Sequence, residues 1–527
     1  MKKTILLLVV AFVFTLTVPL VALDVTVCLS PNGGFAPINN QRKITVAGVE
    51  QPLGLNNSLH DEVLKVPASG AVKICMYNFA HKEIFRVLLD RAVQEGLMVR
   101  VLLDNCADWT TDAVKEFTTT VDKVARHAAE EKKPFDFQVK LVTPAVMDRT
   151  KRTRVLSDGK KIIGTMHQKF GIIYHDRNAS PTTSFGGSAN TAPTSDHTYA
   201  ENRLFFRNSP EVAAVWAAQF ARLWNEYADP GTTNCTPEPE IVITKKPDFD
   251  ILFNVEKLAS GSFVAIDDRV MKMLDEVEPE GSVDIAMFSF THTGIGNKIL
   301  AMAEKYPNAK FRLLFDHSML LSGEDRKGLM PPIIEQKVKE KGMKNVEVRY
   351  KFRANAYAYL SKEKKVGHDH FRAPLLHHKF MIVNKKKIIT GSYNWSGSAE
   401  LRNMEDAVIL TSDLPYGKDA IDRFLAEFDI LWNSRYEDRE AKPEAKPYTV
   451  SREYAMEYEK KILETLGNFA CSKIQRVLDD GALPVSNVRN LAKLNQGELN
   501  KALEMMQAVR MIEKFEKDGV ERWRLAD

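Results

Sequence analysis

Residues 377–405, HHKFMIVNKKKIITGSYNWSGSAELRNME, decide the fold of this chain. They hold a His-x-Lys string, then Gly-Ser-x-Asn, and then a glutamate eleven residues beyond the asparagine. The same parts recur in the same order, starting 210 residues earlier at His167. Two strings with one internal order indicate a duplicated unit. The paired residues are His167 and His377, Lys169 and Lys379, Ser188 and Ser392, Asn190 and Asn394, and Glu201 and Glu405.

These residue types suit chemistry at phosphorus. A neutral imidazole can attack a phosphorus atom, and a second, protonated imidazole can protonate the departing oxygen. Lysine and asparagine side chains donate hydrogen bonds to the non-bridging oxygens, where charge sits in the transition state. A carboxylate behind each histidine would fix its tautomer and stabilise the imidazolium. Because side chains alternate along a strand, a His and a Lys two positions apart lie on one face.

The paired strings resemble the phospholipase D superfamily, whose two HKD motifs share one active site. The resemblance covers roughly residues 24–437, and the GSYNWS string is most similar to the subgroup of small bacterial endonucleases and mitochondrial cardiolipin hydrolase. It implies that His167 attacks phosphorus to form a phosphohistidine and that His377 protonates the leaving alcohol, without metal or cofactor. The implied catalytic set is His167, His377, Lys169, Lys379, Asn190, Asn394, Glu201 and Glu405, with Ser188 and Ser392 binding substrate.

The sequence departs from the family motif at one position in each copy. The family has an aspartate five residues after the lysine, where this chain has Tyr174 and Asn384. Asp176 keeps the strand parity of Tyr174 and is a candidate substitute. These changes leave open a third interpretation, in which the chain is a catalytically silent scaffold of this fold.

The repeat extends to whole lobes. A strand at 72–79, a helix at 83–95 and a strand ending at Asp104 recur as 283–290, a helix through Lys305, and a strand ending at Asp316. This spacing is typical of a βαβ unit with parallel strands. Each copy closes with a similar helix, and its tryptophans, Trp224 and Trp432, are predicted to be core residues. The predicted fold class is therefore α/β: two duplicated phospholipase D-like α/β lobes sharing one active site, plus a small winged-helix-like α+β C-terminal domain.

The predicted domains follow from changes in composition. Residues 1–23 carry two lysines and a long apolar run, which predicts a signal peptide or an uncleaved N-terminal anchor, and hence an exported protein. Residues 24–230 and 231–437 form the two lobes, and 438–450 form a charged, proline-bearing linker. Residues 451–527 read as helices followed by a hairpin that turns at Asp518 and Gly519, and this tail is expected to bind nucleic acid or protein.

Cysteine and histidine spacing argues against a metal site. The five cysteines lack C-x-x-C spacing, which excludes the usual zinc patterns. A disulfide between Cys28 and Cys235 stays open for an exported protein. The extra histidines near the second motif, His368, His370 and His378, come without a matching acidic set, so no metal is predicted.

The substrate remains open between two classes. Phospholipid hydrolysis leads, with contact to a membrane surface through apolar loops at 354–360 and 319–321, and a metal-independent endonuclease acting on DNA or RNA is the alternative. The basic residues of 149–161 suit any polyanion, whereas the lysine triplet 385–387 reads as a solvated turn. The net charge of +4 is too small to identify a nucleic-acid binder.

Overall fold

The computed structural model describes most of the chain. The described residues are 22–30, 43–46, 49–52, 55–150, 152–197, 199–256, 263–320, 328–351, 375–433, 435–436, 446–447, 449–478, 481–509 and 511–525. The predicted signal segment lies almost wholly outside this set, as do His368, His370 and the apolar loop at 354–360. Among the described helices, none is long and apolar enough to cross a membrane.

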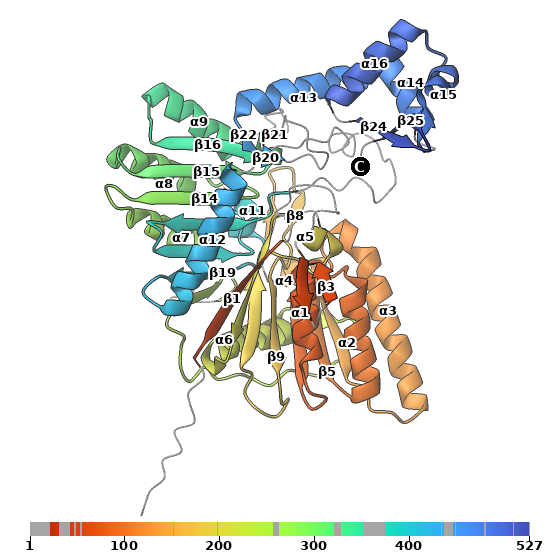
Figure 1. Cartoon of the computed structure of the whole chain (residues 1–527). Coiled ribbons are helices and arrows are strands. Elements are labelled where there is room, and N and C mark those ends of the chain that lie inside the picture. Colours follow the sequence, from red (N-terminus) through yellow and green to blue (C-terminus); the bar gives the residue numbers. More distant parts are fainter. Residues whose placement is uncertain are drawn as a thin grey trace, which may run out of the picture.

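Two eight-stranded mixed sheets with the same strand order form the body of the protein (Figure 1). The first runs β1 (Asp24–Leu29), β11 (Asn202–Arg207), β10 (Thr183–Gly187), β9 (Lys169–Tyr174), β4 (Ala71–Met76), β5 (Met98–Asp104), β6 (Phe137–Val142) and β12 (Asp229–Pro230). The second runs β13 (Asp250–Phe253), β19 (Asp406–Thr411), β18 (Lys387–Gly391), β17 (Lys379–Val383), β14 (Ser282–Met287), β15 (Lys310–Phe315), β16 (Val346–Lys351) and β22 (Thr449–Val450). The matching order confirms the duplicated α/β lobes.

The parallel strands come from the predicted βαβ units. β4, β5 and β6 pair in parallel, as do β14, β15 and β16, while the motif strands β9 and β17 join them antiparallel. The crossover helices are α2 (Lys82–Glu95) and α3 (Asp108–Glu130) in one lobe and α8 (Thr293–Lys305) and α9 (Met330–Lys341) in the other. The first crossover helix of each lobe, α2 or α8, begins at a histidine cap, His81 or His292, whose ring accepts a backbone N–H of the first turn. The helix α1 (Leu55–Leu64) or α7 (Ile266–Asp275) precedes each βαβ unit.

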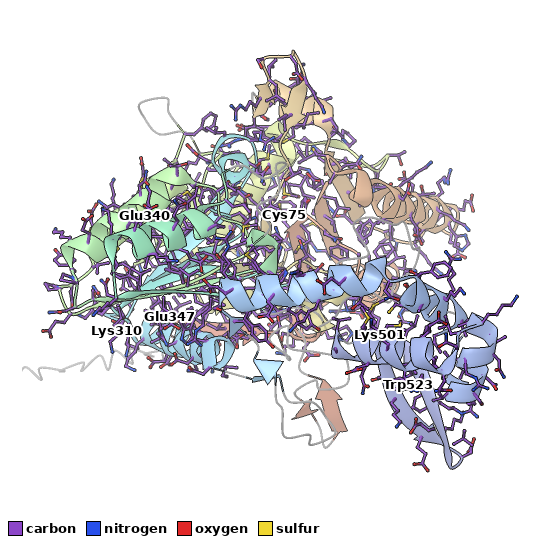
Figure 2. The ribbon with its side chains drawn as sticks, turned by 90° about the horizontal axis from the view of Figure 1, so that it is seen from above. Cys75, Lys310, Glu340, Glu347, Lys501 and Trp523 are labelled. Atoms are coloured by element: carbon purple, nitrogen blue, oxygen red, sulfur yellow. The ribbon has the colours of Figure 1, made fainter. Side chains whose placement is uncertain are left out.

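The closing helices build the core between the lobes. In α6 (Pro210–Glu226), Phe220 stacks on Trp224, and in α12 (Pro415–Asn433) Phe428 stacks on Trp432, both with ring centroids 5.5 Å apart. One continuous buried cluster contains all four rings and side chains from both sheets. Cys75 belongs to this cluster and lies near the middle of the view in Figure 2. The prediction that both tryptophans are core residues is confirmed.

The first lobe extends further than the predicted boundary at residue 230. Gly231 donates to Val139, and Trp224 Nε1 donates to the carbonyl of Thr236. Glu238 forms a buried ion pair with Lys73. Residues 231–238 therefore pack along the edge of the first sheet, and β22 adds a strand to the second sheet beyond residue 437.

The open question of a Cys28–Cys235 disulfide is answered in the negative. Cys28 lies on β1 at one edge of the first sheet, while Cys235 contacts Val139 of β6 near the opposite edge. Six strand spacings of about 4.8 Å separate these strands, whereas a disulfide needs Cα atoms within about 7 Å. Both cysteines are thiols in the structure.

The tail has the predicted order of elements. It comprises α13 (Arg452–Gly467), α14 (Phe469–Leu478), β23 (Leu483–Pro484), α15 (Val485–Ala492), α16 (Gln496–Ala508), β24 (Ile512–Lys517) and β25 (Val520–Leu525). Asp518 and Gly519 both have positive φ, as the tight hairpin turn requires. Buried residues of α13 and the tail continue the core of the second lobe. Figure 2 shows the tail, with Lys501 and Trp523, at one side of the two lobes.

The remaining short elements surround the motifs. The hairpin β7 (Thr153–Val155) and β8 (Lys161–Ile163) follows α4 (Pro144–Arg149) and rises between the lobes (Figure 1). The helices α5 (Pro193–His197) and α11 (Gly397–Leu401) follow the two Gly-Ser-x-Asn strings. The others are β2 (Lys43–Val46), β3 (Val49–Pro52), η2 (His317–Met319), β20 (Arg435–Tyr436) and β21 (Lys446–Pro447).

Candidate active site

The two histidines meet at the junction of the lobes, and each is held by the opposite lobe. The backbone N–H of His167 donates to Met404 O, and that of His377 donates to Ala200 O, each over 2.9 Å. His167 Nδ1 lies 2.8 Å from Glu405 Oε2, and His377 Nδ1 contacts Glu201 Oε1. The glutamates therefore cross over between the lobes. With Nδ1 engaged in both rings, Nε2 is the nitrogen left for a substrate.

Two aspartates anchor the segments that carry the histidines. Asp104 Oδ1 accepts from the N–H of Met166 over 2.8 Å, and Asp316 Oδ2 accepts from the N–H of Leu376 over 2.9 Å. Asp104 is the last residue of β5 and Asp316 directly follows β15, the second parallel strand of each lobe, and both are fully buried. The sequence showed both aspartates at equivalent strand ends but gave them no role. Their duplication was the signal that could have marked them as positioning residues.

The motif lysines lie beneath the histidines. Lys169 Nζ donates to His167 O over 2.5 Å, and Lys379 Nζ donates to His377 O over 2.7 Å. Both side chains are buried, and their ammonium groups lie over the rings of Tyr77 and Phe288. Burial lowers the pKa of Lys169 to about 8 and holds that of Lys379 well below its usual value. Burial outweighs the nearby carboxylates, so each ammonium gains by binding an anionic phosphoryl group.

The motif asparagines are buried with an uncommitted amide. Asn190 Oδ1 and Asn394 Oδ1 both lack a hydrogen-bond partner among the described residues. A buried polar atom without a partner costs free energy, which a substrate could recover. Gly187 and Gly391, three residues earlier, have φ of 149° and 152°, and a Cβ there would fall within 2.6 Å of a backbone oxygen. Only glycine fits, and this explains the Gly-Ser-x-Asn string.

The two serines are not placed as predicted. Ser392 donates its hydroxyl to Glu405 and accepts from the N–H of Asp406, while Ser188 accepts from the N–H of Asn202. Both side chains are fully buried. The expectation that these serines bind substrate is therefore wrong, because their hydroxyls are engaged inside the protein.

Electrostatics differ between the two halves. Burial lowers the pKa of His167 to about 4 and holds that of His377 well below its usual value. Burial also raises the pKa of Glu201 to about 7. For Glu405 burial acts in the same direction, but His167, Lys169 and Ser392 outweigh it and keep its pKa below the usual range. Glu405 is therefore an ionised carboxylate at neutral pH, whereas Glu201 retains a proton on a large fraction of molecules.

This duplicated site matches a known family. A domain family described as "Cardiolipin synthase, PLD-like domain" matches residues 67–224 and 272–432, more than half of the chain. The chain belongs to this phospholipase D-like family. Enzymes of the phospholipase D superfamily cleave or transfer phosphodiester groups.

Individual relatives match smaller parts. Mitochondrial cardiolipin hydrolase is 42% identical over 57 residues, or 11% of this chain, in both Mus musculus and Homo sapiens, and this stretch covers 24% and 21% of those proteins. The chain thus spans about a quarter of these curated relatives. Phosphatidylserine synthase from Haemophilus influenzae is 13% identical with a TM-score of 0.49, over 82% of this chain and 95% of that chain. The phospholipase D family member NUC from Salmonella typhimurium is 19% identical with a TM-score of 0.25, over 36% and 95%.

The departures from the phospholipase D-like motif lie away from the chemistry. Tyr174 ends the six-residue strand that Lys169 begins, about 17 Å along it. The Tyr174 ring is buried, with Lys73 Nζ 4.8 Å from its centroid. Asn384 begins the turn after β17, where it binds the backbone of Glu276 and Glu278. Neither residue contacts a motif histidine among the interactions that the described residues make.

Asp176 does not replace the missing aspartate. Its carboxylate accepts from the N–H of Asn178 over 2.9 Å, which closes a local exposed turn. The suggested substitution is therefore wrong. Of the apolar loop predicted at 319–321, Met319 and Leu320 are buried in the core of the second lobe and cannot face a membrane, while Leu321 lies outside the described residues.

Several basic residues of the loop at 149–161 are engaged in contacts within the protein. Arg152 is buried, and its guanidinium donates to the carbonyls of Asn254 and Asn403, so it ties the hairpin to the second lobe. Arg149 pairs with Asp229, and Lys161 pairs with Asp148. Arg154 and Lys160 stay exposed on the hairpin.

Two histidine clusters resemble metal sites but are built as hydrogen-bonded pairs. His378 is buried between Asn202 and Glu427, which bind its two ring nitrogens. Asp267, His292 and Glu400 place three ligand atoms within 4.8 Å of one another. However, His292 Nδ1 accepts the N–H of Ile295 over 3.1 Å, so Nε2 carries the ring proton toward the carboxylates. That nitrogen has no lone pair to offer a metal ion.

Proposed function

We propose that this protein is a metal-independent phosphodiesterase that hydrolyses anionic phospholipids through a phosphohistidine. The observation that carries the proposal is the crossed arrangement of His167 with Glu405 and His377 with Glu201. It supplies two imidazoles of which one can attack phosphorus and the other can protonate the leaving oxygen.

The surrounding residues suit a phosphoryl group. Lys169 and Lys379 are buried cations, and Asn190 and Asn394 are buried amides whose Nδ2 groups can donate. Together they offer hydrogen-bond donors where charge develops on the non-bridging oxygens. The low pKa of His167, caused by burial, keeps its ring neutral and nucleophilic at physiological pH.

Surface chemistry beside the site favours a lipid. Val155 and Ile163 on the β7–β8 hairpin are 60% and 38% exposed, and Leu401 at the end of α11 is 54% exposed. The base of the hairpin is tied to the segment just after α11, because the N–H of Thr165 donates to Asn403 Oδ1 and Arg152 donates to Asn403 O. Apolar side chains beside the basic Arg154 and Lys160 suit an anionic bilayer surface. The names of the relatives, cardiolipin hydrolase and a cardiolipin synthase domain, support the same substrate class.

A nuclease of the same superfamily is the second candidate. The winged-helix-like tail and the basic hairpin favour it, but α16 alternates Glu498, Lys501 and Glu504 and therefore lacks a positive face for a phosphate backbone. We also propose export through residues 1–23, which rests on the sequence pattern alone. N-terminal sequencing of the protein from fractionated cells tests that part.

The test compares two substrates in parallel. Residues 24–527 are incubated in EDTA with vesicles of anionic phospholipid or with single-stranded DNA, beside a His377→Ala control. Lipid turnover that is lost in the control is expected, and DNA cleavage with intact lipid would make the protein a nuclease. A Val155→Ser, Ile163→Ser variant should lose turnover on vesicles but keep it on a soluble short-chain phospholipid.

A further inference from the structure

The two halves of the site differ at one pair of equivalent positions. Two residues before each glutamate the chain has Asn403 in one half and Tyr199 in the other. Asn403 Nδ2 donates to Glu405 Oε1 over 3.0 Å. Tyr199 instead places its ring beside His377, with centroids 5.6 Å apart. The two equivalent positions therefore present different side chains to the two His–Glu pairs.

Glu405 is bound on both oxygens. Oε2 meets His167 and the hydroxyl of Ser392, and Oε1 meets Asn403. Asn403 is itself fixed, because its Oδ1 accepts the N–H of Thr165 over 3.2 Å and its carbonyl accepts from Arg152 and Asn254. Donors on both oxygens stabilise the ionised carboxylate.

One carboxylate oxygen of Glu201 lacks a hydrogen bond. Its Oε1 contacts His377, and Oε2 is buried without a hydrogen-bond partner among the described residues, while the nearby Ser195 hydroxyl acts to lower the pKa of this carboxyl against the effect of burial. An unsolvated, unpaired carboxylate oxygen favours the protonated acid. The raised pKa of Glu201, which burial causes, agrees with this geometry.

Charged neighbours do not cancel the difference. Lys169 and Lys379 face both His–Glu pairs. Glu405 is also faced by Arg152 and Asp406. The His377–Glu201 pair is also faced by Asp316, His167 and His378. The lysines act on both halves, and Arg152 favours the ionised Glu405 whereas Asp406 opposes it. The hydrogen-bond count at the carboxylates remains the clearest distinction.

We propose that Asn403 and Tyr199 are positioning residues that decide which histidine is the nucleophile and which is the acid. Asn403 holds Glu405 as the ionised carboxylate that makes His167 the nucleophile. Tyr199, at the equivalent position, leaves Glu201 protonated, so that His377 is the acid. This inference rests on the proposed phosphodiesterase function. It gives a structural cause for the assignment that the sequence could make only by resemblance.

The proton balance closes under this assignment. His167 Nε2 bonds to phosphorus while the bond from phosphorus to the leaving oxygen breaks, and that oxygen takes the proton from His377 Nε2. The proton of Glu201 moves to His377 Nδ1, so the ring stays neutral. In the second step a water oxygen bonds to phosphorus and the bond to His167 breaks. The water proton goes to His377 Nε2, and the Nδ1 proton returns to Glu201.

The scheme predicts a bell-shaped dependence of kcat on pH, in which one substitution shifts the acidic limb alone and another shifts the basic limb alone. Activity should fall at low pH as the His167–Glu405 pair gains a proton, and at high pH as the His377–Glu201 pair loses one. Asn403→Ala removes a donor from Glu405, so the midpoint of the acidic limb should move up by about one pH unit while that of the basic limb stays in place. Tyr199→Asn offers a donor to Glu201, so the midpoint of the basic limb should move to lower pH while that of the acidic limb stays in place.

The experiment records these profiles on bis(4-nitrophenyl) phosphate in EDTA and maps the trapped intermediate. Asn403→Asp, which keeps the side-chain shape, should shift the acidic limb in the same direction as Asn403→Ala. Peptide mapping of wild-type protein quenched in alkali should find the phosphoryl adduct on His167. An adduct on His377, or limbs that fail to move in all three variants, would overturn the inference. Absence of turnover in the wild type would instead overturn the proposed function, and this inference with it.

Discussion

Replacing Glu405 with glutamine tests the crossed His–Glu arrangement directly. Glu405 accepts hydrogen bonds from Asn403 and Ser392 and lies 2.8 Å from His167 Nδ1. Glutamine keeps the shape of the side chain but replaces one carboxylate oxygen with an NH₂ group. This group is itself a donor, so it cannot accept the hydrogen bond that the oxygen accepted. It also removes the charge that stabilises a positive charge on the ring of His167.

The expected loss follows from these contacts. Hydrogen bonds to a charged group contribute about 1.5–3 kcal/mol each, and the substitution affects at least two of them. A barrier increase of about 3–5 kcal/mol corresponds to a fall in kcat of about 10²–10⁴-fold. The assay is the initial rate on bis(4-nitrophenyl) phosphate in EDTA, with circular dichroism to show that the fold is retained.

Glu427→Gln is the matched control. Glu427 is also a buried glutamate beside a histidine, His378 Nε2 at 3.3 Å, but this pair lies outside the crossed dyads. Its turnover should stay within about threefold of wild type, which is less than 1 kcal/mol in the barrier. If Glu405→Gln lowers turnover no more than this control does, the orienting role of Glu405 is refuted.

Two further predictions concern metal and stability. Turnover should be unchanged by EDTA, since the proposed chemistry runs on imidazoles alone, and a strict requirement for an added divalent cation would contradict it. Glu238→Ala should lower the free energy of unfolding by about 3–5 kcal/mol, measured by urea denaturation, because it leaves the buried Lys73 and Arg100 without their shared carboxylate. A loss below about 1 kcal/mol would show that the two cations are solvated or re-paired.

Repetition in the sequence predicted most of the fold. The strands and helices from 71 to 104 and from 282 to 315 fall where the βαβ spacing placed them, and the tail hairpin turns at Asp518 and Gly519 as expected. Two copies of one pattern reinforce each other, because a signal that is weak in one lobe is repeated in the next. Both motif histidines come together at the lobe junction as the shared-site prediction required.

The rest depended on contacts that no local pattern encodes. The pairing of Glu405 with His167 and of Glu201 with His377 joins residues from different lobes, so spacing alone could not decide between crossed and uncrossed pairs. The serines were misassigned because a Gly-Ser-x-Asn string does not show which way a buried hydroxyl points. The thiols of Cys28 and Cys235 were equally ambiguous until the sheet order placed them near opposite edges.

Export and the choice between lipid and nucleic acid stay predictions. Residues 1–23 carry the export signal in sequence, and the hairpin residues Val155 and Ile163 carry the argument for a lipid surface. The vesicle and DNA comparison addresses the substrate, whereas the N-terminal sequence of the mature protein addresses export.

The central claim is that both lobes contribute one histidine each to a single active site. The most direct test compares His167→Ala, His377→Ala and the double variant for turnover of bis(4-nitrophenyl) phosphate in EDTA. Residues that act as one unit lose activity non-additively. Each single variant should therefore lose at least about 10³-fold in kcat, and the double variant should lose no more than either. A single variant that keeps about half of the wild-type turnover would show two independent sites and contradict the shared one.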